Sequence, residues 1–226
     1  MRAARGGRIR SLSVEWLGTI AYGEALKLQE RAVEARRAGE TGDRLLLLEH
    51  PPVVTLGRTT RLEHLRVPRQ ELARRSVEVF EVARGGDVTW HGPGQLVGYP
   101  IVDLAGRGRP DVRAFLRRVE AALGAALGEL GVAAETREGW TGVFVAGARP
   151  ARKIASIGIG VRGWVTWHGF ALNVDCDLAG FEAIVPCGLH GVEMTSVARE
   201  LGAAAPRDLM KRARAAVGRA FAERLG

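Results

Sequence analysis

The chain has 226 residues, of which 46% are hydrophobic and 26% are charged, and these values exclude a disordered chain, a collagen and a disulfide scaffold. No apolar run approaches the roughly 20 residues that cross a bilayer, and no apolar segment follows the basic first residues, so we expect a cytoplasmic protein that contacts no membrane. The formal net charge of +8 favours an acidic partner.

Hydrophobic periodicity predicts helices and strands mixed along the chain. Helices are expected at residues 19–38, 67–75, 111–130, 195–201 and 207–225, and strands at 44–49, 53–56, 77–82, 96–102, 132–136, 142–145, 153–161 and 164–174. Because Pro100 cannot donate a backbone hydrogen bond, the strand at 96–102 is expected to be irregular or at a sheet edge. The order predicts an α+β fold, a mixed and largely antiparallel sheet flanked by helices, in one domain over residues 1–226.

The first segment that contains candidate functional residues is RGGDVTWHGPGQ, residues 84–95, which follows a predicted strand. Its glycines permit a close backbone approach, and the segment lacks the Gly-Lys-Ser/Thr of a phosphate-binding loop. An ordinary hairpin turn would explain the glycines alone. Functional side chains crowded into twelve residues favour a binding loop instead: Arg84, Thr89, Trp90, His91 and Gln95.

The second segment, ARKIASIGIGVRGW at residues 151–164, contains a literal G-x-G-x-x-G. A dinucleotide site needs a helix after these glycines, and the sequence that follows is typical of a strand, so we reject that interpretation. Lys153 is one of only three lysines among 33 basic residues. A lysine can lose its proton whereas arginine effectively cannot, which suggests a functional role, although a solvent-exposed lysine at a strand end is equally compatible.

The third segment, residues 167–191, contains both cysteines. Asp175 and Asp177 flank Cys176 and are expected to raise the pKa of its thiol, whereas Cys187 has no nearby carboxylate. Cys187 is therefore the better candidate nucleophile, and a small buried hydrophobic residue is the alternative interpretation. His168, followed by Gly169, suggests a close backbone approach to a ligand.

The remaining histidines carry less information. His64 lies in a polar stretch and is expected to be exposed, and His50 precedes two prolines and is expected to pack or cap. His168, Cys176, Cys187 and His190 lack the short paired spacing of a zinc site, so no metal is expected.

Together these segments resemble the lipoyl(octanoyl) transferases, the octanoyltransferases of lipoate synthesis. The matching motifs are R-G-G-x-x-T-x-H-G-P-G-Q at residues 84–95, K-I-A-S-I-G at 153–158, H-G-F-A-L-N-V at 168–174, V-P-C-G-L at 185–189 and E-H-P-P-V-V-T-L-G-R at 49–58. The resemblance extends from about residue 15 to residue 202. It implies the fold of the biotin and lipoate protein ligases, with no cofactor.

The resemblance also implies a reaction and its residues. An octanoyl (or lipoyl) group would pass from acyl carrier protein to a lysine of the lipoyl domains of 2-oxoacid dehydrogenase complexes or of the glycine cleavage H protein, as the first step of protein lipoylation. Cys187 would be the nucleophile, and Lys153 would either stabilise its thiolate as a cation or act as a base. Substrate contacts would come from Arg84, Gly85, Gly86, Asp87, Val88, Thr89, Trp90, His91, Ser156, Ile157, Gly158, Gly169, Phe170 and Ala171.

Two other functions are compatible with parts of the sequence. A lipoate or biotin protein ligase would use the same scaffold and ATP, with Lys153 on a carboxylate or phosphate and no need of Cys187. The basic composition would suit a nucleic-acid-binding protein, but the arginines are scattered and no nucleic-acid motif is present, so no nucleic acid is expected as a partner.

Overall fold

The computed structural model describes residues 11–107, 110–185 and 191–226. Its centre is a sheet of eight strands among these residues. Seven strands follow one another in space, in the order β1 (Ser13–Thr19), β2 (Arg44–Glu49), β6 (Gln95–Ile101), β10 (Val165–Asn173), β9 (Ala151–Arg162), β8 (Trp140–Val145) and β7 (Ala134–Arg137), and β11 (Val192–Met194) also pairs with β9.

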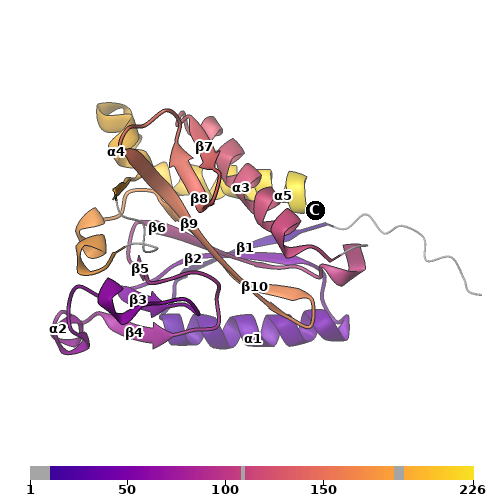
Figure 1. Cartoon of the computed structure of the whole chain (residues 1–226). Coiled ribbons are helices and arrows are strands. Elements are labelled where there is room, and N and C mark those ends of the chain that lie inside the picture. Colours follow the sequence, from indigo (N-terminus) through magenta and orange to yellow (C-terminus); the bar gives the residue numbers. More distant parts are fainter. Residues whose placement is uncertain (1–10, 108–109, 186–190) are drawn as a thin grey trace, which may run out of the picture.

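The pairing within the sheet is mixed and largely antiparallel, which confirms the predicted fold class. The pairs β1–β2 and β11–β9 are parallel, and the other neighbours are antiparallel. A second, smaller sheet is formed by β4 (Glu78–Glu81), β3 (Val53–Leu56) and β5 (Thr89–His91). It lies beside α1 in Figure 1, below the main sheet.

Helices cover both faces of the main sheet (Figure 1). On one face, α1 (Tyr22–Ala38) packs its buried residues against β2, β6 and β10. On the other face, α3 (Val112–Glu129) and α5 (Leu209–Leu225) pack against each other and on the sheet. The short helices are α2 (Arg69–Arg74) and α4 (Val197–Leu201), with 3-10 turns at Leu62–His64, Ala105–Arg107, Leu178–Ala183 and Gly202–Ala204. Of the helices described, none combines the length and apolar character that crossing a membrane requires.

The helix α3 shows how the sequence pattern produces this packing. Phe115, Val119, Leu123 and Leu127 recur every four residues and are all buried in the core between the helices and the sheet. The Asp111 side chain accepts a hydrogen bond from the Ala114 backbone nitrogen at 2.9 Å and so caps the N-terminus.

Pro100 does not place β6 at an edge, because β6 lies between β2 and β10. The pairing of β6 with β10 stops at Gly98, and the Pro100 carbonyl accepts a hydrogen bond of 2.6 Å from the Thr166 hydroxyl on that side. A residue's N–H and C=O point to the same side of an antiparallel strand, so the missing N–H lies beyond the end of the ladder. The proline therefore costs this central strand no hydrogen bond.

Three strands were not anticipated from the sequence, namely β1, β5 and β11. The strands β5 and β11 have three residues each, too few for a period-2 pattern to be recognised. The exposed edge strand β1 leaves Val14 and Trp16 39% exposed each, so its sequence shows no clear division between a buried and a solvent face.

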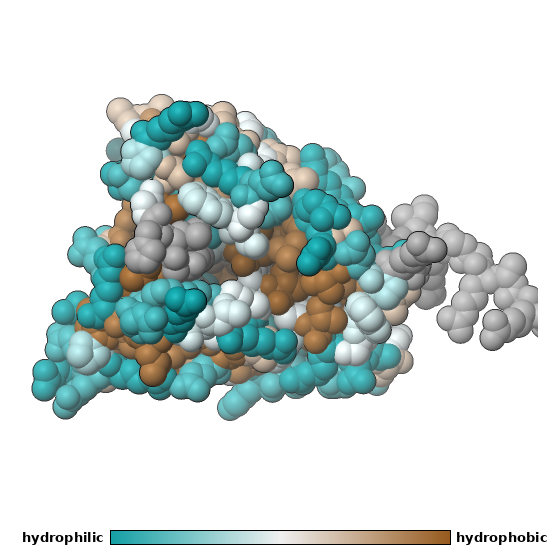
Figure 2. All heavy atoms as spheres, in the orientation of Figure 1, coloured by the Kyte–Doolittle hydropathy of each residue, from teal (hydrophilic) through white to brown (hydrophobic). Residues whose placement is uncertain are grey.

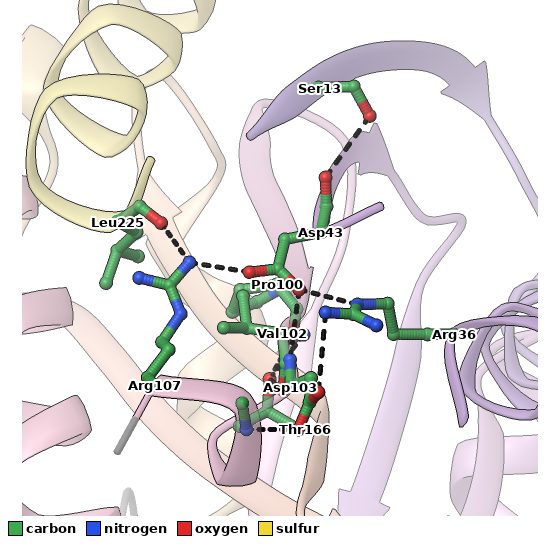
Figure 3. Close-up of polar contacts among 10 residues, drawn as sticks. Ser13, Arg36, Asp43, Pro100, Val102, Asp103, Arg107, Thr166 and Leu225 are labelled. Carbon is green, nitrogen blue, oxygen red and sulfur yellow. Dashed lines mark hydrogen bonds and ion pairs between the residues drawn. The ribbon is translucent and has the colours of Figure 1, made fainter. Parts of the chain in front are cut away.

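Asp43 joins four parts of the fold at one end of the main sheet (Figure 3). Its carboxylate accepts hydrogen bonds from Arg36 Nε at 2.7 Å, Arg107 Nη2 at 2.6 Å and the Asp103 backbone nitrogen at 3.1 Å. Arg107 also donates to the carbonyl of Leu225 at the end of α5. Burial alone raises the pKa of Asp43, but the hydrogen bonds from Arg36 and Arg107 outweigh it and hold the pKa below its ordinary value.

Candidate functional site

A cavity of about 280 Å³ opens between the main sheet, the small sheet and the start of α1. Its wall collects residues from β6, β9 and β10 and from the glycine-rich segment at 84–91. Twelve of the residues predicted for the site line it: Arg84, Gly86, Asp87, Thr89, His91, Lys153, Ser156, Ile157, Gly158, Gly169, Phe170 and Ala171. The glycine-rich segment at 84–91 thus meets β9 and β10, which lie more than 50 residues later in the sequence, at one place.

Three predicted contact residues lie outside the cavity wall, and one falls outside the described residues. Val88 and Trp90 are buried in the core beneath the small sheet, where Trp90 contacts the ring of Phe181. Gly85 donates its backbone N–H to the carbonyl of Ile159 at 3.1 Å and so holds the segment rather than lining the cavity. Cys187 belongs to residues 186–190, which are not described.

The glycine-rich segment is fixed between the two sheets by Arg84. Its guanidinium is buried and donates to the carbonyl and hydroxyl of Thr55 in β3, at 2.8 and 2.9 Å from Nη2. On the other side a Cβ on Gly158 would lie 2.8 Å from the carbonyl oxygen of Gly85. Only a glycine at position 158 lets the segment approach β9 so closely.

Lys153 is 2% exposed and donates from Nζ to the carbonyl of Thr141 at 2.9 Å, and Nζ lies 5.6 Å from the ring centroid of Phe144. A Cβ on Gly142 would lie 2.7 Å from Lys153 Cε, so the glycine leaves the channel through which the side chain passes. The solvent-exposed alternative for this lysine is wrong. Its side chain is part of the cavity wall.

The described chain on both sides of residues 186–190 is tied to this region. Val185 donates its N–H to the carbonyl of His64 at 2.7 Å. Met194 in β11 is the register partner of Lys153, and the N–H of Thr195 bonds the Lys153 carbonyl at 3.0 Å.

His64 is not exposed as expected, because its side chain is 12% exposed and Nδ1 is paired with the Asp87 carboxylate. The other carboxylate oxygen of Asp87 accepts the Val88 N–H at 2.6 Å. This pair connects the glycine-rich segment to the 3-10 turn at 62–64. Sequence reasoning missed it because the two residues are 23 positions apart.

A cluster of buried aromatic and imidazole rings forms part of the cavity wall with Tyr22, His91 and Tyr99, and His50 packs against all three rings. His50 Nδ1 donates to the Ile20 carbonyl at 2.7 Å, which leaves Nε2 to accept from the Tyr99 hydroxyl at 2.7 Å. Burial lowers the pKa of His50 to about 4 and raises that of Tyr22 to about 12. Tyr22 and Tyr99 line the cavity. They are the only tyrosines in the sequence, and this rarity could have marked them as candidate site residues.

His91 has a defined tautomer. Its Nδ1 donates to the Gln95 side-chain oxygen at 2.7 Å, and the Gln95 amide donates in turn to Asn173 Oδ1 at 2.9 Å. Burial, reinforced by the neighbouring His50, lowers the pKa of His91 to about 3. At neutral pH the ring therefore presents an acceptor at Nε2.

Two sequence interpretations change in detail. The pKa of Cys176 is raised to about 12, and burial is the larger cause, ahead of Asp175 and Asp177. Gly169 is required by the β6 backbone, because a Cβ there would lie 1.9 Å from the Gly98 carbonyl oxygen. Among the described residues no group of three His, Cys, Asp or Glu side chains is arranged to hold a metal ion.

The glycines of β9 and the hydrophobic residues between them give this strand two different faces. Ile157, Ile159 and Val161 are partly buried and pack on the core with α3 and α5. Figure 2 shows hydrophobic side chains gathered near the middle of the same view as Figure 1, where β9 and β10 cross the sheet, within a hydrophilic surround.

Comparison with known proteins identifies relatives over most of the chain. The family model of the lipoyl protein ligase A/B catalytic domain matches residues 21–219. An octanoyltransferase of Geobacter sulfurreducens is 50% identical over 91% of this chain and 81% of its own length, and one of Myxococcus xanthus is 48% identical over 88% of this chain but only 56% of its own. The bipartite lipoate protein ligase of Thermoplasma acidophilum has the same fold, with a TM-score of 0.71 at 16% identity over 95% of this chain and 84% of that one.

Proposed function

Because the chain belongs to the octanoyltransferases of the lipoyl protein ligase A/B catalytic domain family, we propose that it transfers an octanoyl group from acyl carrier protein to a lysine of a lipoyl domain through a thioester on Cys187. The enzyme is an acyltransferase of lipoate metabolism. The donor, the covalent intermediate and the acceptor lysine are the proposed parts.

The observation that carries the proposal is the buried side-chain amino group of Lys153 in the cavity wall. A cysteine thiol with an ordinary pKa is only a few per cent thiolate at pH 7, so a nucleophilic cysteine needs a cation or a base beside it. Lys153 is buried at the cavity, and its register partner Met194 brings the chain back to it seven residues after Cys187.

In the first half-reaction Lys153 takes the proton of Cys187, and the thiolate attacks the carbonyl carbon of the octanoyl thioester. A new C–S bond to Cys187 forms, the C–S bond to the carrier breaks, and the leaving thiolate receives the proton from Lys153. The acyl group is now on the enzyme. Exchange of one thioester for another is nearly isoenergetic, so this half needs no ATP.

In the second half-reaction the amine of the acceptor lysine attacks the acyl-enzyme. The C–N bond of the amide forms, the bond to Cys187 breaks, and Lys153 moves a proton from the amine to the departing sulfur. The product amide is more stable than the thioester and drives the sequence forward. The net charge of +8 suits acidic protein partners in both halves.

The test is a transfer assay that separates the transferase from an ATP-dependent ligase. A purified lipoyl domain is incubated with the enzyme and either octanoyl-carrier protein without ATP or free octanoate with ATP, and its mass is measured. Octanoylation of the domain in the first mixture alone is expected. Octanoylation in the second mixture alone would overturn the proposal and indicate a ligase.

A matched pair of variants assigns the nucleophile. Cys187→Ser is expected to abolish transfer, while Cys176→Ser is expected to retain it because the Cys176 thiol is buried and its pKa is about 12. The opposite pattern would overturn the assignment.

A further inference from the structure

Three residues on neighbouring strands form a row across the cavity wall. Ala171 of β10 is the register partner of Val97 in β6 and of Ser156 in β9. Residues directly opposite each other in antiparallel strands point to the same face of a sheet, so the three side chains lie side by side. All three line the cavity. The row therefore runs across the strands along one wall of the cavity.

One end of this row lies beside Lys153. Lys153 and Ser156 are three positions apart on β9, a spacing that places side chains on opposite faces of a regular strand. The β8–β9 pairing shifts register between Lys153 and Ala155, where one step along β8 matches two steps along β9. An extra residue of this kind is a β-bulge, and it lets the side chains of Lys153 and Ser156 both reach the cavity wall.

The other end of the row is closed at Val97. The next residue across the sheet is Leu48 of β2, the register partner of Val97. Both side chains are 1% exposed and pack in the hydrophobic core between the sheet and α1. Among the described residues that line the cavity, none belongs to β2. In the direction of the row, the cavity therefore ends at Val97, and Leu48 is packed behind it.

The length of the row matches an eight-carbon acyl chain. Two strand spacings of about 4.8 Å separate Ser156 from Val97, which gives about 10 Å. An extended octanoyl chain, with C–C bonds of about 1.5 Å, spans about 9 Å. The chemical character changes in the corresponding order, because the hydroxyl of Ser156 lies at the end near Lys153, and the methyl groups of Ala171 and Val97 follow. A chain whose carbonyl lies at Ser156 thus has its terminal methyl group at Val97.

We propose that the octanoyl chain lies across the strands along this row, and that Val97 determines the acyl-chain length by contacting the terminal methyl group. This rests on the proposed function, because it requires the thioester carbonyl to lie beside Lys153. A longer chain collides with Val97, and a shorter chain leaves part of the apolar wall uncovered. One methylene group gained or lost in an apolar pocket changes kcat/KM by about tenfold or more. Ala171 has the smallest side chain of the row and leaves room for the middle of the chain.

The experiment compares kcat/KM for the hexanoyl, octanoyl and decanoyl thioesters of the carrier protein, with the lipoyl domain as acceptor. Val97→Ala shortens the side chain at the end of the row and is expected to raise the decanoyl-to-octanoyl ratio about tenfold. Val97→Leu lengthens this side chain and is expected to raise the hexanoyl-to-octanoyl ratio by a similar factor. Ala171→Leu, which fills the middle of the same row, replaces the second variant if that variant does not fold, with the same direction expected.

A matched control separates the cavity from the core around it. Val165→Ala removes the same two methyl groups from a residue of β10 that is also 1% exposed and packs in the same core as Val97, but lies outside the cavity wall. It should lower the stability without changing the decanoyl-to-octanoyl ratio. Ratios that are unchanged in every folded variant of the row, while octanoyl transfer persists, would overturn the inference. Failure of the wild type to transfer any of the three chains would refute the proposed function instead.

Discussion

Asp43 and His168 are buried polar residues at different places on the main sheet, and they differ in whether the protein supplies their hydrogen-bond partners. Asp43 is held by Arg36, Arg107 and a backbone N–H (Figure 3), whereas His168 in the cavity wall has neither ring nitrogen paired among the described residues. Both side chains are almost inaccessible to water. A buried polar group whose partners come from the fold stabilises the fold, and one without partners among the described residues needs a partner from elsewhere.

Acidification should lower the stability of the protein through three buried histidines. His50, His91 and His168 have pKa values of about 4, 3 and 3 in the folded protein, below the unfolded value of about 6.5. The unfolded state therefore binds more protons between these limits, and the stability is full above about pH 6.5 and lost as the pH falls toward 4. Urea unfolding should show a loss of about 6 kcal/mol between pH 7 and pH 5, about 2 kcal/mol for each histidine.

A variant assigns part of that loss. His168→Asn should remove about 2 kcal/mol of the change between pH 7 and pH 5, because one titrating group is gone. An unchanged pH profile in this variant would show that His168 titrates alike in the folded and unfolded states.

Lys153 is expected to contribute to the transfer reaction and little to stability. Lys153→Met keeps a long unbranched side chain at the buried position, so the urea midpoint should change little. Transfer to the lipoyl domain should fall by about 10²- to 10⁴-fold, since the proton shuttle is lost. Equal losses of stability and activity would instead assign Lys153 to the fold.

Asp43 is expected to contribute to stability and not to the transfer reaction. Asp43→Ala leaves the half-buried guanidiniums of Arg36 and Arg107 without their carboxylate, and about 3 kcal/mol of stability should be lost, while kcat/KM of the folded protein is unchanged. Removal of the exposed carboxylate in Asp208→Ala, which pairs with Arg212 at the start of α5, serves as the control and should cost at most about 1 kcal/mol. A change in kcat/KM in Asp43→Ala would link this network to the cavity.

The smallest expected change in stability comes from a variant that removes the hydrogen-bond partner of His50. Tyr99→Phe removes the hydroxyl that donates to His50 Nε2 and should cost about 1 kcal/mol in urea unfolding. Unchanged or increased stability would show that water replaces the Tyr99 hydroxyl at His50 Nε2. A buried histidine nitrogen without a protein partner would then carry little cost.

The sequence carried the main elements of the fold because long amphipathic segments such as α3 report their buried face directly. It could not reveal the unpaired His168, since a positive φ inside a strand depends on contacts with Gln29 and with β9 that no local pattern encodes. The edge position that Pro100 suggested for this strand was wrong for the same reason, although the β6–β10 ladder does end before the proline. Where its missing N–H points depends on where the β6–β10 ladder ends.

The candidate site was anticipated from three motifs, and the structure brings most of their residues to one cavity. Residues without a motif were missed, among them Tyr22, Tyr99 and Trp140. The pairing of His64 with Asp87 was also missed, because sequence distance hides a contact that the fold creates.

The most direct test of the account is the intact mass of the enzyme after a single exposure to octanoyl-carrier protein without ATP, followed by peptide mapping. One octanoyl group on the peptide that contains Cys187, labile to hydroxylamine and absent in Cys187→Ser, is the predicted result. An adduct on Cys176, or transfer to the lipoyl domain with no acyl-enzyme and full activity in Cys187→Ser, would contradict it.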